Sequence, residues 1–388
     1  MLESLDDPYK DRKQAEVKHH LLSKYLERLI NIVGRKPDIN EFVYVDAFAG
    51  PWQESKENYE DTSFGIALSI LEQAYARLSN ERTYTIRAIF IEKDPIAFRR
   101  LEAFTNSRTG NVVATCRNAA FSECVPELAQ LRGFSFYLID PKGFKDCVEA
   151  DVLRPLLRNQ NAELLINFMW SFIKLAVGHI GKNDSHAQNM SRLFGPLEDI
   201  AGVKDREGFL IQRYQGMLVS QQASRLGRAR IRSTKFRVDN PKLAGTKYYL
   251  VFTSHSPYGT IEFAKNSETT EAVQTGIIAN EKVRKVAEGA GMFRDLFGAT
   301  DQQPVAHDTI NALKHAWLQL VPKLGDTRAV TVDVFADLIE EFDCVPRDLQ
   351  AALSRLIVEK VIVNRNAKKL RPTNVVDWSK KEILERVG

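Results

Sequence analysis

The 388-residue sequence predicts an α/β protein, with a doubly wound sheet followed by a small C-terminal domain. Two observations indicate this class. Apolar, strand-like runs alternate with helical patterns over most of the chain, which is typical of βαβ units with parallel strands. The chain is also longer than the size at which a single hydrophobic core keeps growing, so we expect a second domain.

The elements of the predicted sheet follow one another in a regular order. A helix at 13–33 has its apolar residues near one face and precedes the first strand. A second helix is predicted at 64–79, and the last two strands, 229–238 and 246–255, would form a hairpin. The five strands before that hairpin are predicted at 42–48, 85–94, 111–121, 134–144 and 162–170.

Polar side chains stand where four of these strands end. They are Asp46, Glu92, Asn118 and Asp140. For any one of them a structural turn is the alternative, but open α/β sheets bind their ligands at this carboxyl edge. The small residues Ala49 and Gly50, which follow Asp46, would let a ligand approach the backbone closely. The sequence therefore predicts a ligand site at this edge.

The chemistry of the strand ends favours one ligand. No phosphate-loop motif is present, and Asp46 would repel a pyrophosphate but attract a cation. Glu92 can accept hydrogen bonds from ribose hydroxyls, Asp46 can act on an amino-acid group, and Asn118 can meet an adenine edge. These roles together match S-adenosylmethionine. No histidine or cysteine pair has a metal-ligand partner, so no metal site is predicted.

Three motifs resemble class I S-adenosylmethionine-dependent methyltransferases: VDAFAGP at 45–51, FIEKDP at 90–95 and LIDPKGF at 138–144. More narrowly, the chain resembles the bacterial three-Cys-motif partner protein family, as do KHHLLSKYL at 18–26, SFGIAL at 63–68 and INFMWSFIKLAVGH at 166–179. The resemblance covers roughly 15–260 and implies a Rossmann-like methyltransferase domain, here expected at 1–297. The expected donor site comprises Lys18, Asp46, Phe48, Ala49, Gly50, Glu92, Lys93, Asn118 and Ala119.

The segment at the end of the fourth strand is where we expect the methyl acceptor to bind. Enzymes that methylate exocyclic amino groups of bases often carry Asp or Asn, two prolines and an aromatic residue there. This chain matches that pattern in part, with Asp140, Pro141 and, displaced by one position, Phe144. These three residues are the predicted catalytic group. The alternative interpretation is a structural turn that begins with Asp-Pro.

Two basic segments, at 225–247 and at 346–381, indicate an anionic partner. Residues 225–247 hold eight Lys or Arg against one acid, and Arg228, Arg230 and Arg232 would share one strand face. Residues 305–388 predict a winged helix-turn-helix domain with helices at 306–320, 331–342 and 346–359. In that domain Arg347 and Gln350 would enter a groove, and the wing tip would contact phosphates through Arg365, Lys368 and Lys369.

The sequence as a whole predicts a bacterial, cytoplasmic methyltransferase that acts on nucleic acid. The four cysteines are scattered, the N-terminus has no signal-peptide pattern, and no apolar run approaches the ~20 residues of a membrane span. Three other functional interpretations fit the same residues. They are a catalytically silent methyltransferase fold that binds a bacterial protein partner, a DNA-binding regulator that senses a nucleoside metabolite, and a metal-dependent nuclease.

Overall fold

The structure is a computed structural model that describes residues 9, 13–50, 59–177, 184–197, 200, 202–221, 229–243, 245–287 and 305–388. The chain divides into two compact units, Met1–His255 and Ser256–Gly388. The long helix α9 (Pro257–Ala287) belongs to the second unit. The domain boundary expected between 297 and 305 falls almost wholly outside the described residues and stays a prediction.

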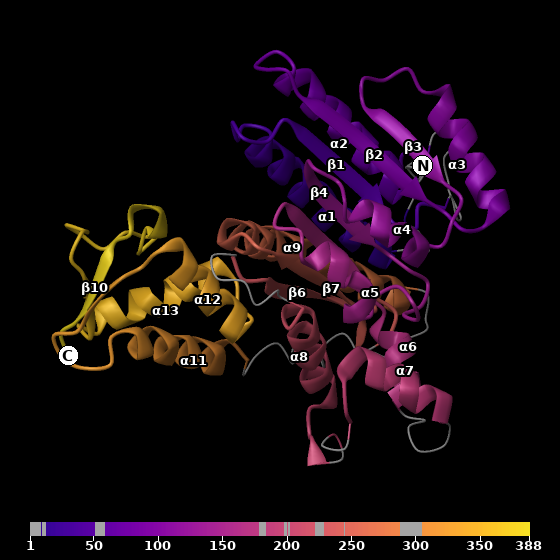
Figure 1. The fold of residues 1–388 in the computed structure, drawn as a ribbon. Coiled ribbons are helices and arrows are strands. Elements are labelled where there is room, and N and C mark those ends of the chain that lie inside the picture. The colour runs from indigo at the N-terminus through magenta and orange to yellow at the C-terminus, as the bar shows by residue number, and fades with distance from the viewer. Residues whose placement is uncertain are drawn as a thin grey trace. The chain divides into compact units, whose positions relative to one another are not determined.

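The first unit alternates helices and strands along the chain (Figure 1). Its helices are α1 (Lys13–Val33), α2 (Ser63–Leu78), α3 (Pro95–Ser107), α4 (Phe121–Leu128), α5 (Ala150–Leu157), α6 (Trp170–Val177), α7 (Asp184–Phe194) and α8 (Arg206–Val219). Its strands are β1 (Glu41–Asp46), β2 (Thr85–Ile91), β3 (Val113–Arg117), β4 (Phe134–Ile139), β5 (Ala162–Phe168), β6 (Arg232–Asp239) and β7 (Thr246–Ser254).

These strands form one mixed sheet, which has seven strands within the described residues, in the order β3-β2-β1-β4-β5-β7-β6. Strands β1 to β5 run parallel, while β7 runs antiparallel to both β5 and β6. The predicted strands and the closing hairpin are thus confirmed. The strand order reverses between β1 and β4, and ligands of open α/β sheets bind at such a switch point.

Alternating side chains of the strands bury both faces of the sheet. On β1, Phe42 and Tyr44 stack on Phe134 and Phe136 of β4, and Tyr25 of α1 packs on Phe136. Helices α1, α2 and α3 cover this face. The intervening β1 residues Val43 and Val45 belong to a second core, to which α4, α5 and α8 contribute. The sheet is therefore doubly wound, as predicted.

The second unit consists of helices packed on a small antiparallel sheet. After α9, its elements are α11 (Val305–Leu320), β8 (Thr327–Ala329), α12 (Val332–Phe342), α13 (Pro346–Val358), β9 (Ile362–Asn364), the 3-10 turn η2 (Trp378–Lys380) and β10 (Ile383–Arg386). The described strands pair in the order β8-β10-β9. Trp317 is fully buried at the centre and donates to the Leu349 carbonyl at 2.9 Å. Strand β8 is short and was not predicted.

No helix among the described residues is long and apolar enough to cross a membrane.

Candidate functional site

Asp46 ends β1 beneath the carboxyl edge of the sheet and is fully buried. Its carboxylate accepts the Phe48 backbone N–H at 3.1 Å and the Ser63 hydroxyl at 2.7 Å. Burial raises the pKa of Asp46 to about 6, although these two donors act to lower it. Asp46 therefore shapes the loop after β1 and remains a charge that responds to pH near neutrality.

The start of α2 brings Ser63 to Asp46. Thr62 caps the helix by accepting the Gly65 N–H at 3.1 Å. A Cβ on Gly65 would lie 2.0 Å from the Tyr59 carbonyl oxygen, so only glycine allows the chain to pass this closely. The SFGIAL segment thus begins a helix at the position from which Ser63 reaches the β1 carboxylate.

Glu92 follows β2, and its side chain is only 4% exposed. One carboxylate oxygen accepts the Asp94 N–H at 2.7 Å. Asn118, at the end of β3, donates its amide to the carbonyls of Glu92 and Lys93 at 2.9 and 3.2 Å. Asn118 therefore positions the segment that carries Glu92. Its amide nitrogen is engaged in these two bonds, although the side chain was expected to contact the adenine edge.

Asp140 follows β4 and has a partner on each carboxylate oxygen. The Lys18 ammonium of α1 contacts one oxygen, and the Asn167 amide of β5 donates to the other. Burial acts to raise the pKa of Asp140, but the Lys18 charge and the Asn167 hydrogen bond outweigh it, so the pKa is lowered. Asp140 is thus held as a carboxylate in a fixed orientation.

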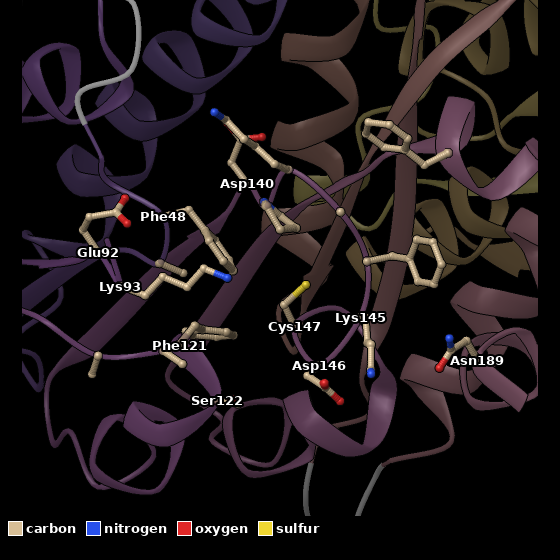
Figure 2. A pocket seen from close by; sticks show the side chains of 18 of the residues that line it. Phe48, Glu92, Lys93, Phe121, Ser122, Asp140, Lys145, Asp146, Cys147 and Asn189 are labelled. Carbon is tan, nitrogen blue, oxygen red and sulfur yellow. The ribbon is translucent and has the colours of Figure 1, made fainter. Parts of the chain in front are cut away.

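A cavity of about 970 Å³ opens above these strand ends (Figure 2). Glu92, Lys93, Phe48 and Phe121 lie on one side of it, while Lys145 and Asn189 lie on the other, with Asp140 and Cys147 between. The lining combines apolar residues such as Phe48, Phe121 and Phe144 with charged ones such as Glu92 and Asp140. The volume lies at the upper end of the range for small-molecule sites, so two reacting groups fit together.

Seven of the predicted site residues line this cavity: Phe48, Glu92, Lys93, Ala119, Asp140, Pro141 and Phe144. Ala49 is buried and donates to the Ile91 carbonyl at 3.0 Å, so it joins the loop after β1 to β2. Gly50 is buried beside it. The sequence did not indicate the lining residues Phe121, Ser122, Cys147, Phe172, Asn189 and Met190.

The expected row of arginines before and in β6 is corrected at one position, Arg232. Arg228 lies outside the described residues, and Arg230 is exposed but precedes the strand. Arg232 begins β6 and is only 3% exposed, so its side chain is packed inside the unit. Of the two arginines that the structure describes, Arg230 and Arg232, only Arg230 is exposed, so they do not share a solvent face.

Three of the residues expected to contact nucleic acid in the second unit have partners inside it. Gln350 exchanges two hydrogen bonds with the Val376 backbone, at 2.9 and 3.0 Å, so its role as a base reader is corrected to a structural one. Arg365 forms a bidentate pair with Glu385 at 2.6 Å, and Arg347 pairs with Glu268 at 3.4 Å. Lys368 and Lys369 are exposed.

Among the described residues, no group of three His, Cys, Asp or Glu side chains is placed to hold a metal ion.

Comparisons with known proteins found distant structural similarities. No family model and no curated protein matches the chain. A Legionella pneumophila protein of the family DUF519 is 11% identical, with a TM-score of 0.36 over 67% of this chain and 91% of that one. Human methyltransferase-like protein 13 with SAH is 12% identical, with a TM-score of 0.30 over 67% and 92%. Loganic acid methyltransferase with SAH is 12% identical, with a TM-score of 0.25 over 97% and 94%. Similarity at this level does not establish relationship.

Proposed function

We propose that the chain is an S-adenosylmethionine-dependent methyltransferase that acts on an amino group of a nucleic-acid base. One observation carries the proposal: Glu92 and Asp140, on opposite sides of the switch point between β1 and β4, line a single cavity. The sheet that places them also ends in the antiparallel hairpin expected from the resemblance to class I methyltransferases. The resemblance to the three-Cys-motif partner proteins is part of this proposal.

The residues of the cavity fit the parts of the donor. Glu92 is buried and has one oxygen engaged by Asp94, which leaves acceptor capacity for ribose hydroxyls. Ala119 and Phe121 provide an apolar wall for the adenine. Lys18 and Asp46 do not line the cavity, but they carry opposite charges beside it, which we assign to the carboxylate and ammonium of the amino-acid end. When bound, the donor supplies a methyl group on a sulfonium.

The chain's contribution to the reaction is orientation. Methyl transfer depends on holding the acceptor in line with the donor, and such positioning is worth several kcal/mol of the barrier. Asp140, which Lys18 and Asn167 hold ionised in the structure without a donor, accepts a hydrogen bond from the acceptor N–H and so fixes its lone pair. Its lowered pKa suits holding the N–H better than removing the proton. The donor leaves as the neutral thioether S-adenosylhomocysteine, and the methylated nitrogen, cationic after the transfer, releases its proton to water.

Aromatic and cationic residues of the cavity favour a base as the acceptor. Phe144 and the half-exposed Phe172 line the cavity and offer ring faces on which a base stacks. Lys145 is exposed at the same wall, where it can contact a phosphate. A base in a duplex would have to leave its stack to reach Asp140, so single strands and loops are the favoured substrates.

The second unit is proposed to be a winged helix-turn-helix that holds the nucleic acid. The proposal is supported by helices α11, α12 and α13, which lie close to the expected ranges, and by the basic segment 365–382 between β9 and β10. Arg355, Lys368 and Lys369 are exposed and have no ion-pair partner among the described residues. We assign phosphate contact to these three, in place of the paired Arg347 and Arg365.

Transfer of a tritiated methyl group from S-adenosylmethionine to RNA and DNA tests the function. Separate reactions should contain total RNA, single-stranded DNA and duplex DNA. We expect label in a nucleic acid, and none with the Asp140→Ala protein. Donor binding without transfer to any of the three would overturn the nucleic-acid substrate and favour the catalytically silent, partner-binding alternative.

A further inference from the structure

The contact between Lys18 and Asp140 joins the two halves of the proposed site. The two residues lie 122 positions apart, and their side chains are only 13% and 18% exposed. Lys18 belongs to the expected donor site, whereas Asp140 belongs to the acceptor site. This ion pair therefore links a residue of one half of the proposed site to a residue of the other.

Lys18 stands above two neighbouring strand ends. Strands β1 and β4 run parallel with Asp46 opposite Leu138, so Asp46 and Asp140 end at the same edge. The Lys18 charge acts to lower the pKa of both carboxylates, although burial raises the pKa of Asp46 overall. No other lysine of α1 contacts Asp140 within the described residues. Lys18 is thus a cation next to both strand-end carboxylates, in addition to Lys93, which lines the cavity itself.

We propose that Lys18 is a positioning residue shared between Asp140 and the donor's carboxylate. Given the proposed function, on which this mechanism rests, donor binding draws the Lys18 ammonium onto the donor. The carboxylate oxygen of Asp140 that Lys18 leaves is then open to the acceptor N–H. The protein consequently binds its donor first, and the acceptor engages Asp140 only afterwards.

The chemistry of the residues allows this exchange. Lysine carries a compact charge on a flexible stem with three donors, so its ammonium can turn from one carboxylate to another nearby. Asn167 holds the second oxygen of Asp140 and keeps the side chain in place when Lys18 turns. The donor's carboxylate replaces the contact that Lys18 gives up, so no buried cation is left unpaired.

Calorimetry with two probes tests the proposal without an acceptor. S-adenosylhomocysteine carries the amino-acid end, and 5′-methylthioadenosine lacks it. Lys18→Met should weaken S-adenosylhomocysteine binding about ten- to hundredfold and leave 5′-methylthioadenosine unchanged. Lys18→Arg should retain most of the affinity. The control is Lys24→Met, which removes an exposed lysine of the same helix and should change neither affinity.

The decisive variant is Asp140→Asn, which removes the competitor for Lys18. It should bind S-adenosylhomocysteine severalfold tighter than the parent, and this gain should vanish in the double variant with Lys18→Met. A gain that persists in the double variant, or no gain at all, would overturn the sharing of Lys18. If the parent binds neither probe while its melting temperature shows it folded, the proposed function itself fails.

Discussion

Glu163 on β5 makes the stability of the first unit depend on pH, and the size of this effect follows from the surroundings of the side chain. The side chain is 2% exposed and accepts hydrogen bonds from Tyr25 of α1 at 2.7 Å and Ser254 of β7 at 2.8 Å. Burial raises the pKa of Glu163 to about 7 from an ordinary 4.5, against the lowering effect of both donors. Because Tyr25 and Lys18 share helix α1, Glu163 also seats the helix that reaches the proposed site.

The sign of the effect follows from the raised pKa. The folded protein holds the Glu163 proton more tightly than the unfolded chain, so this group favours the fold below pH 4.5. That advantage is lost as the pH rises from 4.5 to 7. The folded and unfolded pKa values differ by about 2.5, and a difference of one is worth about 1.4 kcal/mol. Ionisation of Glu163 therefore lowers the free energy of unfolding by about 3 kcal/mol at pH 8. At pH 5 only about 1 kcal/mol of this stabilisation has been lost.

Glu163→Gln keeps the shape of the side chain and removes the charge. Urea unfolding of the first unit, monitored by circular dichroism, should show that the variant is more stable than the parent at pH 8. Its advantage in free energy of unfolding should be about 2.5 kcal/mol larger at pH 8 than at pH 5. Glu27→Gln, an exposed change on α1, should show no such difference. An equal effect of Glu163→Gln at both pH values would refute the reasoning.

Three further predictions concern the site and the second unit. Because the pKa of Asp46 is raised to about 6, S-adenosylmethionine affinity measured by calorimetry should fall up to about tenfold per pH unit below 6, and Asp46→Asn should abolish that slope. Asp140→Ala should lower methyl transfer at least about 100-fold in the tritium assay without weakening donor binding; unchanged turnover would remove Asp140 from the reaction. Reversing the charge of Lys368 and Lys369 in the full chain should lower binding to all nucleic-acid sequences alike and reduce the salt slope by about two; an unchanged slope would exclude this surface.

Local pattern was sufficient to predict the sheet and the residues at its edge. A strand ends where its apolar run stops, so Asp46, Glu92 and Asp140 could be placed at one edge before their distances were known. Phe121 was missed because the apolar segment around it was interpreted as the end of the third strand. It instead begins α4, where Glu123 accepts the Ala120 N–H at 3.1 Å.

Partners distant in the chain account for the other differences. Gln350 and Arg365 were expected to face outward, as helix and turn positions suggest. Their partners, Val376 and Glu385, come from segments whose pairing depends on the folded sheet of the second unit. The pairing of Lys18 with Asp140 spans most of the first unit in the same way. Residue type alone does not reveal which charges a fold will neutralise.

Donor binding tests the account most directly. Calorimetry of the full chain with S-adenosylmethionine should show one site, and Glu92→Ala should weaken binding by about 1.5–3 kcal/mol, the range for hydrogen bonds to a charged group. Glu127→Ala, at an exposed position of α4, serves as the control and should bind like the parent. No binding by the parent, or equal affinity in the Glu92→Ala protein, would contradict the assignment of this cavity to the methyl donor.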